Sequence, residues 1–525
     1  MSKMKNIIIL PLLACASLSA VAQSAATRRP NILYIMTDDH AQQAISCYDG
    51  RYNRTPGIDR IAAEGMRFEN SFVANSISGP SRACMITGKH SHANGFLDNE
   101  SGDFNGEQQT LPKLLQKAGY TTAVIGKWHL GSTPTGFDYW NIFPGQGSYY
   151  NPDMYSAQGK QRYPGYATDI TTDQGIEWID SQRNSQKPFC LLLHYKAVHR
   201  NWLSDSSHMR MYEDVTFPIP STFYDTYAER PAAAAQDMSI AQSMDLAYDN
   251  KVIDPSVNTR HKMGFLSGEL ARMTPAQRAQ WDKVYAPLTA DFMARNLSGN
   301  ELSEWKYQRY MRDYLKCVAS VDDNIVRLLD YLQANGLLEN TIVVYASDQG
   351  FYLGEHGWFD KRFMYEESMR TPLVVRMPDS QTSAPRGKVA VQMVQNIDYA
   401  PTFLELAGVP IPSDIQGESF LPILRGERVK NLHPDGLYYH FYEYPGEHQV
   451  RRHEGVRGDR YKLMHFYGHD IDSWELYDLK TDPTELKNLY NEPRMAKVQQ
   501  DMHARLDRLK VKYGAEQAMT IKKNK

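Results

Sequence analysis

Short apolar runs rich in β-branched and aromatic residues alternate along this sequence with longer segments that repeat apolar residues at helical spacing. Parallel strands need helical crossovers between them, so the alternation favours an open, mainly parallel α/β sheet with helices on both faces. In a sheet of this type the ligand site lies beyond the carboxyl ends of the strands. The predicted parallel strands are residues 31–36, 121–125, 189–194, 341–345 and 373–377.

The predicted helices follow from the same pattern and from the glycines that stop them. Residues 111–118, 310–335 and 398–406 have helical spacing. The residues after these helices include Gly119, Gly336 and Gly408, which can adopt the left-handed conformation that commonly ends a helix. Residues 149–167 and 231–293 fit neither pattern well, and we expect them to be insertions around the core.

The composition is that of a folded globular protein. The chain has 525 residues, of which 42% are hydrophobic and 23% charged, so it is long enough for more than one structural unit. A formal net charge of -3 creates no general field that would attract nucleic acid, and we expect no nucleic-acid partner. An anionic substrate would have to be held by cations clustered at one place.

The first residues have the pattern of an export signal. Two lysines precede the apolar run 7–18, and Ala20-Val21-Ala22 matches a small-x-small cleavage site. We therefore expect residues 1–22 to be a signal peptide, cleaved between Ala22 and Gln23, and the protein to be secreted or periplasmic. The alternative is a lipid anchor at Cys15. We expect no transmembrane segment in the rest of the chain.

The remaining cysteines are scattered and show no paired spacing, which favours buried free thiols over disulfides or a thiolate metal site. These cysteines are Cys47, Cys84, Cys190 and Cys317.

The residue pattern changes near Leu437, where short alternating segments rich in Tyr, His and Arg begin. Residues 438–444, 455–466 and 474–479 predict a small antiparallel sheet, and residues 495–513 predict a final helix. We accordingly divide the mature chain into a catalytic domain, 23–430, and a C-terminal subdomain, 431–525, that contributes to the substrate pocket.

Carboxylates and an amide follow two of the predicted strands. Asp38 and Asp39 come just after the first strand, while Asp348 and Gln349 come just after the run 341–345. A set of oxygen ligands without cysteine or paired histidine favours calcium or magnesium over zinc. Calcium accepts irregular mixtures of carboxylate and amide more readily, although an acid pair at a strand end is also common in solvated loops.

The most informative string begins at Ser78 and reads Ser-Gly-Pro-Ser-Arg-Ala-Cys-Met-Ile-Thr-Gly. It places a small nucleophile at the start of a predicted helix, where anions are favoured. Taken alone, the string could also be a serine-rich turn that caps a helix. It resembles the signature of the type I sulfatases, Cys or Ser followed by x-Pro-Ser-Arg, four residues and Thr-Gly. In that family the first residue is converted to formylglycine, here Ser78.

Further segments resemble the same family in the same order along the chain: 30–39, 126–131, 196–199, 347–350 and 354–361. The resemblance implies an alkaline-phosphatase-like α/β domain with a smaller C-terminal domain, one bound calcium ion and hydrolysis of an organic sulfate. It also implies that Asp38, Asp39, Asp348 and Gln349 hold the metal together with the modified Ser78. Gln349 stands where the family more often has Asn or His.

The resemblance implies catalytic roles that suit the chemistry. Lys127 and Lys361 would neutralise sulfate oxygens, and Arg82 would hold the hydroxyls of the nucleophile. Hydrated formylglycine would attack the sulfur, after which His129 would deprotonate its second hydroxyl to expel sulfate. His199 would be the general acid for the leaving alcohol. Such a protein needs a formylglycine-generating maturation enzyme as a partner.

The substrate is expected to be a sulfated saccharide. Segments 354–362, 438–445 and 455–463 are similar to the N-acetylglucosamine-6-sulfatase branch, which implies the 6-O-sulfate of N-acetylglucosamine in heparan- or heparin-type or other host glycans. The chain also has a cluster of cations and tyrosines between residues 438 and 462, although a solvated strand face would show the same composition. The candidate sugar contacts are Asp360, Arg370, His448 and His453.

Three alternatives stay open at this point. An aryl or other small-molecule sulfatase would ignore sulfated sugars. A phosphatase or phosphonate hydrolase of the same superfamily would use an unmodified Ser78. A non-catalytic glycan-binding protein would keep the basic C-terminal surface and release no sulfate.

Overall fold

The computed structural model describes residues 29–100, 102–257 and 260–516, and the predicted signal peptide with Cys15 lies outside these residues. None of the helices in the described residues combines the length and the apolar character that crossing a membrane requires. The four cysteines are free thiols as predicted, although Cys47 is only half-buried.

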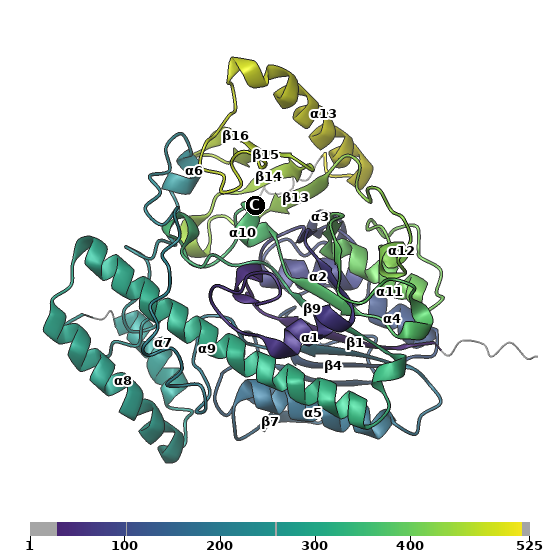
Figure 1. Ribbon diagram of the computed structural model, residues 1–525, viewed down its shortest axis with the longest axis horizontal. Coiled ribbons are helices and arrows are strands. Elements are labelled where there is room, and N and C mark those ends of the chain that lie inside the picture. Colours follow the sequence, from purple (N-terminus) through teal and green to yellow (C-terminus); the bar gives the residue numbers. More distant parts are fainter. Residues whose placement is uncertain (1–28, 101, 258–259, 517–525) are drawn as a thin grey trace, which may run out of the picture.

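A ten-stranded mixed sheet forms the centre of the molecule, in the order β11-β2-β10-β9-β1-β8-β4-β5-β6-β7 (Figure 1). Its middle is parallel: β1 pairs with β8 and β9, and β4 pairs with β8 and β5. These five strands are β1 (Asn31–Thr37), β4 (Thr121–Lys127), β5 (Tyr139–Phe143), β8 (Phe189–His194) and β9 (Thr341–Ser347). The predicted α/β fold with a mainly parallel sheet is confirmed.

The predicted direction of the fifth strand is wrong. β10 (Leu373–Arg376) runs antiparallel to β9 and to β2 (Met66–Phe68). The chain between β9 and β10 contains no long crossover helix, only the one-turn α10 (Glu366–Met369) and a 3-10 turn. It therefore turns back beside β9 and does not cross the sheet. β11 (Lys388–Ala390) completes this edge, and β3 (Ser71–Phe72) pairs separately with β12 (Val394–Gln395).

The central strands are buried on both faces, and their side chains alternate between two cores. Leu33 and Ile35 of β1 face a core that includes α1, α5 and α9, whereas Ile32 and Tyr34 face a core that includes α2, α4 and α11. The helices on the first face are α1 (Pro56–Glu64), α5 (Ala167–Gln182) and α9 (Gly299–Ala334). Those on the second are α2 (Ser78–Thr87), α4 (Leu111–Lys117) and α11 (Tyr399–Leu406), with the one-turn α3 (Ser91–Asn94) and α12 (Leu421–Leu424) nearby.

The three glycines after the predicted helices have positive φ angles, as a helix stop requires. The long helix α9 begins at Gly299, eleven residues before the predicted start. Figure 1 shows it crossing one face of the sheet.

The two expected insertions have different structures. Residues 149–167 contain a hairpin, β6 (Asp153–Ser156) and β7 (Gly159–Arg162), which extends the main sheet beyond β5. Residues 231–293 contain α6 (Pro231–Ala234), α7 (Arg260–Leu270) and most of α8 (Pro275–Arg295). Figure 1 shows α7 and α8 projecting to the side of the sheet.

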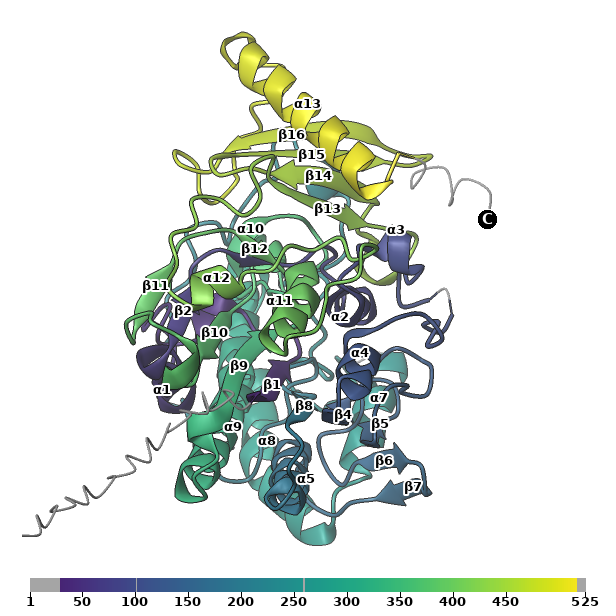
Figure 2. The same ribbon diagram turned by 90° about the vertical axis from the view of Figure 1, so that its right-hand side faces the viewer.

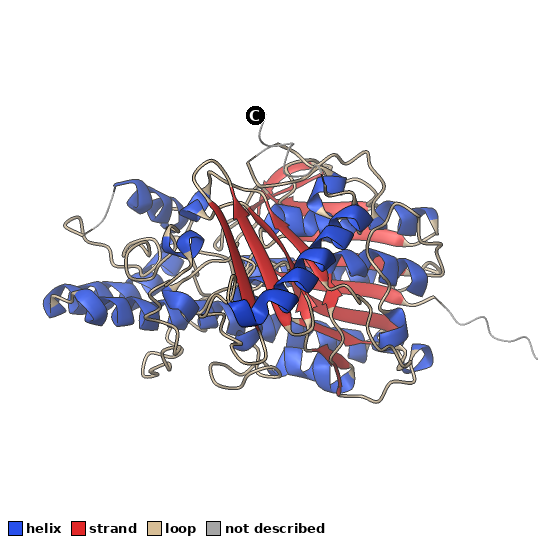
Figure 3. Ribbon diagram, turned by 90° about the horizontal axis from the view of Figure 1, so that it is seen from above, coloured by secondary structure: helices blue, strands red, loops and turns tan. Residues whose placement is uncertain are grey.

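The predicted antiparallel C-terminal sheet is present with four strands, β13 (Leu437–Phe441), β14 (His453–Arg457), β15 (Tyr461–Tyr467) and β16 (Asp472–Asp478). The run 455–466 includes parts of two strands, β14 and β15, because the chain turns after Gly458. One face of this sheet packs against α13 (Ala496–Tyr513), which lies across the strands in Figure 3. The other face packs on the main domain through Tyr439, Phe441 and Phe363.

A buried carboxyl group in this contact makes stability depend on pH. Burial raises the pKa of Glu475 from 4.5 to about 7, although Tyr365 and Tyr477 each donate a hydrogen bond of 2.7 Å to its Oε2. The folded state thus keeps a proton that the unfolded chain has already lost between about pH 4.5 and 7. The free energy of unfolding should fall as pH rises through this window.

Glu475→Gln should flatten this part of the pH profile, measured by denaturant unfolding from pH 4.5 to 7.5. The exposed Glu339→Gln serves as the control and should keep the wild-type slope. Equal slopes in the wild type and Glu475→Gln would contradict the assignment.

Candidate active site

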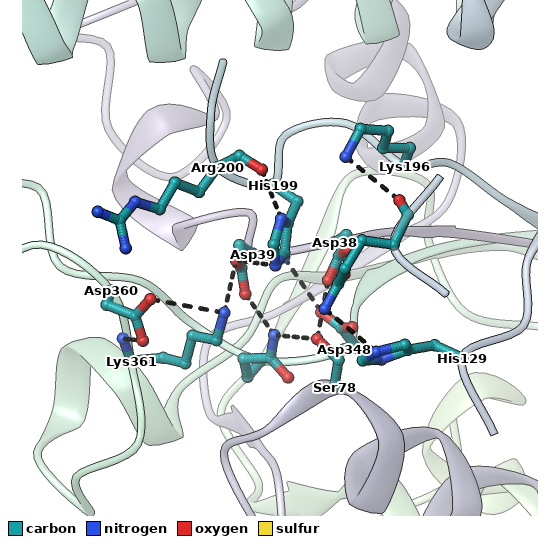
Figure 4. A network of polar contacts seen from close by, with 12 residues as sticks. Asp38, Asp39, Ser78, His129, Lys196, His199, Arg200, Asp348, Asp360 and Lys361 are labelled. Atoms are coloured by element: carbon teal, nitrogen blue, oxygen red, sulfur yellow. Dashed lines mark hydrogen bonds and ion pairs between the residues drawn. The ribbon is translucent and has the colours of Figure 1, made fainter. Parts of the chain in front are cut away.

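The parallel strands bring the predicted site residues to one edge of the sheet. Because Thr37 is in register with Ser347, and Met36 and Gly126 are each in register with His194, strands β1, β9, β8 and β4 end at the same level. Asp38 and Asp39 follow β1, Asp348 and Gln349 follow β9, Lys127 ends β4, and His199 lies five residues beyond β8. Figure 4 shows the side chains of Asp38, Asp39, Asp348 and His199 gathered around Ser78.

Three carboxylates form the centre of the site. Asp38, Asp39 and Asp348 are almost completely buried, and each offers an oxygen within 4.8 Å of the others. Burial raises the pKa of Asp39 to about 6 and that of Asp348 to about 7. Asp38 is equally buried, but the positive charges of Lys127 and Arg82 hold its pKa well below the usual range. Three buried acids at this separation call for a cation.

The donor set fits a hard divalent cation. Besides the carboxylates, the buried amide oxygen of Gln349 has no hydrogen-bond partner among the described residues. The Gln349 amide lies against Asp39, and its Nε2 is 3.3 Å from the Ser78 hydroxyl. Carboxylate and amide oxygens in this mixture are the ligands of calcium or magnesium.

Ser78 is the first residue of α2 and is 1% exposed. Its hydroxyl donates a 3.0 Å hydrogen bond to Asp38 Oδ1. The N-terminus of α2 adds partial positive charge at this position. The side chain that could become the nucleophile therefore lies between the carboxylate cluster and a helix N-terminus.

Three cations surround the carboxylates. Lys127 Nζ contacts Asp38, and Lys361 Nζ lies 2.8 Å from Asp39 Oδ2. The Arg82 guanidinium contacts Asp348 Oδ2 at 3.0 and 3.1 Å and the Lys127 carbonyl at 2.8 Å. Arg82 thus holds Asp348 beside Ser78, and its contact with the hydroxyls of a modified residue 78 stays a prediction.

Two histidines lie on either side of Ser78. His129 Nε2 is 3.1 Å from Gln146 Nε2, and His199 Nε2 is 3.7 Å from Asp39 Oδ2. Burial and the nearby lysines hold the pKa of both imidazoles well below 6.5, so both are neutral without substrate. His199 Nδ1 lies 2.6 Å from the Arg200 carbonyl, which fixes the orientation of the ring.

Two further residues complete the polar network. Gln146 contacts Lys127 and His129, while Lys196 Nζ lies 3.2 Å from the Gln146 carbonyl and 4.7 Å from the Tyr149 ring. Neither residue is among those with a role predicted from the sequence. Lys196 belongs to one of the matching segments, 196–199, which could have indicated it, whereas Gln146 lies in a glycine-rich loop without any such signal.

A pocket of about 340 Å³ opens above these groups. Its floor includes Ser78, His129 and His199, and its walls come from segments that are distant in sequence. The wall residues include Asn99, Arg200, Tyr248, Asp360, Arg362, Glu443 and Glu447.

The four candidate sugar contacts lie in different places. Asp360 lines the pocket and lies 3.2 Å from Arg362 Nε and 3.4 Å from His448 Nε2, so His448 stands behind it. Arg370 is in another cavity, where it pairs with Glu366. His453 is fully buried among aromatic rings of the C-terminal sheet and Phe363 of the loop after β9. Tertiary packing places Arg370 and His453 outside the pocket, so neither is in position to contact a sugar bound there.

Comparison with known proteins identifies the family. Residues 30–409 match the family model described as Sulfatase, and residues 354–512 match the model described as N-sulphoglucosamine sulphohydrolase, C-terminal. The chain belongs to the sulfatase family. The second match runs from the loop after β9 to α13, so it includes both Lys361 and the C-terminal sheet.

Several sulfatases resemble this one over most of their length. An N-acetylglucosamine-6-O-sulfatase from Bacteroides thetaiotaomicron is 48% identical over 96% of this chain and 91% of its own. A human N-acetylglucosamine-6-sulfatase is 26% identical over 84% of this chain and 71% of its own. A solved structure, in complex with its substrate D-glucosamine-2-N,6-O-disulfate, is 48% identical with a TM-score of 0.88, covering 93% of this chain and 99% of that one.

The same fold occurs in a phosphonate monoester hydrolase of Agrobacterium radiobacter, with a TM-score of 0.67 and 18% identity over 92% of this chain and 96% of that one.

The carboxylate cluster predicts stabilisation by a divalent cation. A cation at about 100 times its dissociation constant should stabilise the folded protein by about 2.7 kcal/mol. Asp39→Asn keeps the shape of the side chain but removes one charge, so it should lose most of this gain. Thermal unfolding with calcium, magnesium or a chelator measures it, and exposed Asp214→Asn is the matched control. A melting temperature that no divalent cation changes would contradict the site.

Proposed function

We propose that this sulfatase hydrolyses the 6-O-sulfate ester of N-acetylglucosamine or a related glucosamine residue in a sulfated glycan. The observation that carries this proposal is the position of the Ser78 hydroxyl, 3.0 Å from Asp38 and beside a buried carboxylate cluster paired with two lysines. A relative that is 48% identical over nearly the whole chain is an N-acetylglucosamine-6-O-sulfatase, and this supports the choice of sugar and position.

The proposed cofactors are one calcium ion and formylglycine generated from Ser78 by a maturation enzyme. Calcium is supported by the irregular set of three carboxylates and one free amide oxygen. Hydrated formylglycine at residue 78 would supply one hydroxyl to attack the sulfur and a second whose deprotonation releases the sulfate. An unmodified serine has no second hydroxyl and so has no equivalent route for releasing the sulfate.

The cations of the site would neutralise the sulfate ester. Lys127 pairs with Asp38 and Lys361 pairs with Asp39, so a sulfate group bound beside Ser78 would lie near both ammonium groups. Burial lowers the pKa of Lys127 to about 8, while the pKa of Lys361 is raised to about 12 by Asp360 and Asp39 despite burial. Lys361 is therefore fully charged at neutral pH. Arg82 holds the Asp348 carboxylate in place.

The two histidines would carry the protons. His129 is neutral and close to Ser78 in the pocket, so it can accept a proton from a hydroxyl at residue 78. His199 would donate a proton to the sugar oxygen as the bond between sulfur and that oxygen breaks. The negative charge of a bound sulfate ester would raise the pKa of His199 and favour its protonated form.

The walls of the pocket suit a sugar ring. Asp360 and Glu443 provide carboxylates that can accept hydrogen bonds from sugar hydroxyls, and Arg362 joins the two at 3.2 and 2.9 Å. Glu443 comes from the loop after β13, so the C-terminal subdomain contributes to the substrate pocket in this proposal. His448, in the same loop, would hold Asp360 in position. A secreted or periplasmic location fits an enzyme that acts on glycans outside the cell.

The first test of the proposal is the position of the sulfate. Sulfate release from N-acetylglucosamine 6-sulfate should exceed release from 2-O- and 3-O-sulfated sugars, measured by ion chromatography with matured protein. Ser78→Ala should lower kcat by about 10⁴-fold or more, because the nucleophile is lost. Equal rates for all three positions would contradict the substrate, and a fully active Ser78→Ala variant would contradict the mechanism.

A second test separates a sugar sulfatase from an aryl sulfatase. Asp360→Asn should lower kcat/KM for N-acetylglucosamine 6-sulfate by about 10- to 100-fold, since a hydrogen bond to a charged group is lost. The loss for a small aryl sulfate, which has no ring hydroxyls to bind, should be clearly smaller. Exposed Asp379→Asn is the control. An equal loss on both substrates would mean that Asp360 acts on catalysis and not on the sugar.

A further inference from the structure

A second cavity, of about 590 Å³, adjoins the catalytic pocket. The two share Asn99, Glu100 and His129, so they are continuous through these three residues. We call this second cavity the side groove. It lies along the edge of the main sheet, over β5 and β6, which Figure 2 shows beyond β4.

Aromatic side chains line the side groove. Trp128 and Phe143 are buried beneath it, Trp140 is half-buried, and Tyr155 is 40% exposed. Tyr155 belongs to the β6–β7 hairpin, the insertion that extends the sheet. The indole N–H of Trp140 has no hydrogen-bond partner among the residues that the structure describes. Large aromatic faces combined with a few polar groups are typical of pockets for small organic ligands.

The charges of the side groove differ from those of the catalytic pocket. Its charged lining residues are Glu100 and Asp103, and neither side chain forms an ion pair within the described part of the chain. Lysine and arginine are absent from the described lining of the side groove, whereas the catalytic pocket is lined by Arg200, Lys361 and Arg362. The catalytic pocket also has carboxylates in its lining, but it offers cations that can pair with an anion, whereas the side groove offers none in its described lining.

We propose that the side groove is a subsite for an uncharged sugar linked to the sulfated glucosamine. This inference rests on the proposed function and adds the identity of the neighbouring residue in the glycan. The aromatic faces would contact the apolar side of the sugar ring, while Glu100 and Asp103 would accept hydrogen bonds from its hydroxyls. The same carboxylates would repel a neighbouring hexuronate or sulfated sugar. The preferred glycan then alternates sulfated glucosamine with a neutral sugar.

The test compares four substrates that all carry a 6-sulfated N-acetylglucosamine. They are the monosaccharide, two disaccharides with a neutral hexose joined at C1 or at C4, and a disaccharide with a hexuronate. At least one neutral disaccharide should have kcat/KM about tenfold above that of the monosaccharide. The hexuronate disaccharide should have a lower kcat/KM than that neutral disaccharide and than the monosaccharide. Equal or better hydrolysis of the hexuronate disaccharide would overturn the proposal.

Variants locate the effect in the side groove. Trp140→Ala should reduce the ratio of kcat/KM for the neutral disaccharide to that for the monosaccharide to about one. Asp103→Asn should raise kcat/KM for the hexuronate disaccharide several-fold. Exposed Tyr224→Ala and Glu339→Gln, which lie outside both cavities, are the matched controls and should change neither ratio. Ratios that stay at the wild-type values in Trp140→Ala and Asp103→Asn would also overturn the proposal.

These outcomes are distinct from a failure of the proposed function. If the matured protein releases no sulfate from any of the four substrates, the sugar assignment fails. If it hydrolyses all four at similar rates, the sugar assignment stands and the side groove is not a subsite.

Discussion

The charge balance around three buried carboxylates is the constraint on which the rest of the site depends. Asp38, Asp39 and Asp348 would repel one another in a medium of low dielectric constant, and burial by itself favours their protonated forms. Each is paired with a different cation, Lys127, Lys361 or Arg82. A divalent cation among the carboxylate oxygens would remove the remaining repulsion. The Ser78 hydroxyl is held by the same cluster, so metal binding and the orientation of the nucleophile are coupled.

The sheet brings the carboxylates and one of their cations together because its parallel strands end at the same level. The carboxylates come from β1 and β9, and one lysine comes from β4, so the central layer of the fold fixes their spacing. The sugar-facing side is built differently, from loops after β9 and β13 and from the insertion before α9. Loops can change without disturbing the sheet, which is how related sulfatases can keep one reaction and differ in substrate.

Much of the fold could be predicted because its signals are local. Strand β8 has the predicted bounds, and the glycines after α4, α9 and α11 end these helices as expected. The direction of β10 could not be predicted, because it depends on whether the preceding connection crosses the sheet. The turn at Gly458 was missed because both flanking strands have the same composition.

For the site, residues that directly follow a strand could be placed by argument, as for Asp38 and Asp348. Contacts between distant loops could not be predicted from the sequence. The pairing of Arg82 with Asp348 was not predicted, and Gln146 gave no signal at all. His453 had the right residue type for a sugar contact, yet aromatic side chains from both domains bury it. Only the folded chain shows which polar groups remain accessible.

The central claim is that turnover requires formylglycine, formed by oxidation of Ser78, beside the carboxylate cluster that would hold the metal ion. It is tested most directly by measuring sulfate release from N-acetylglucosamine 6-sulfate across preparations whose formylglycine fraction at residue 78 is determined by peptide mass. Formylglycine is about two hydrogens lighter than serine, so the two forms are resolved. The account predicts a rate proportional to the formylglycine fraction, with no activity at zero. Full activity in a preparation that contains only serine would contradict it.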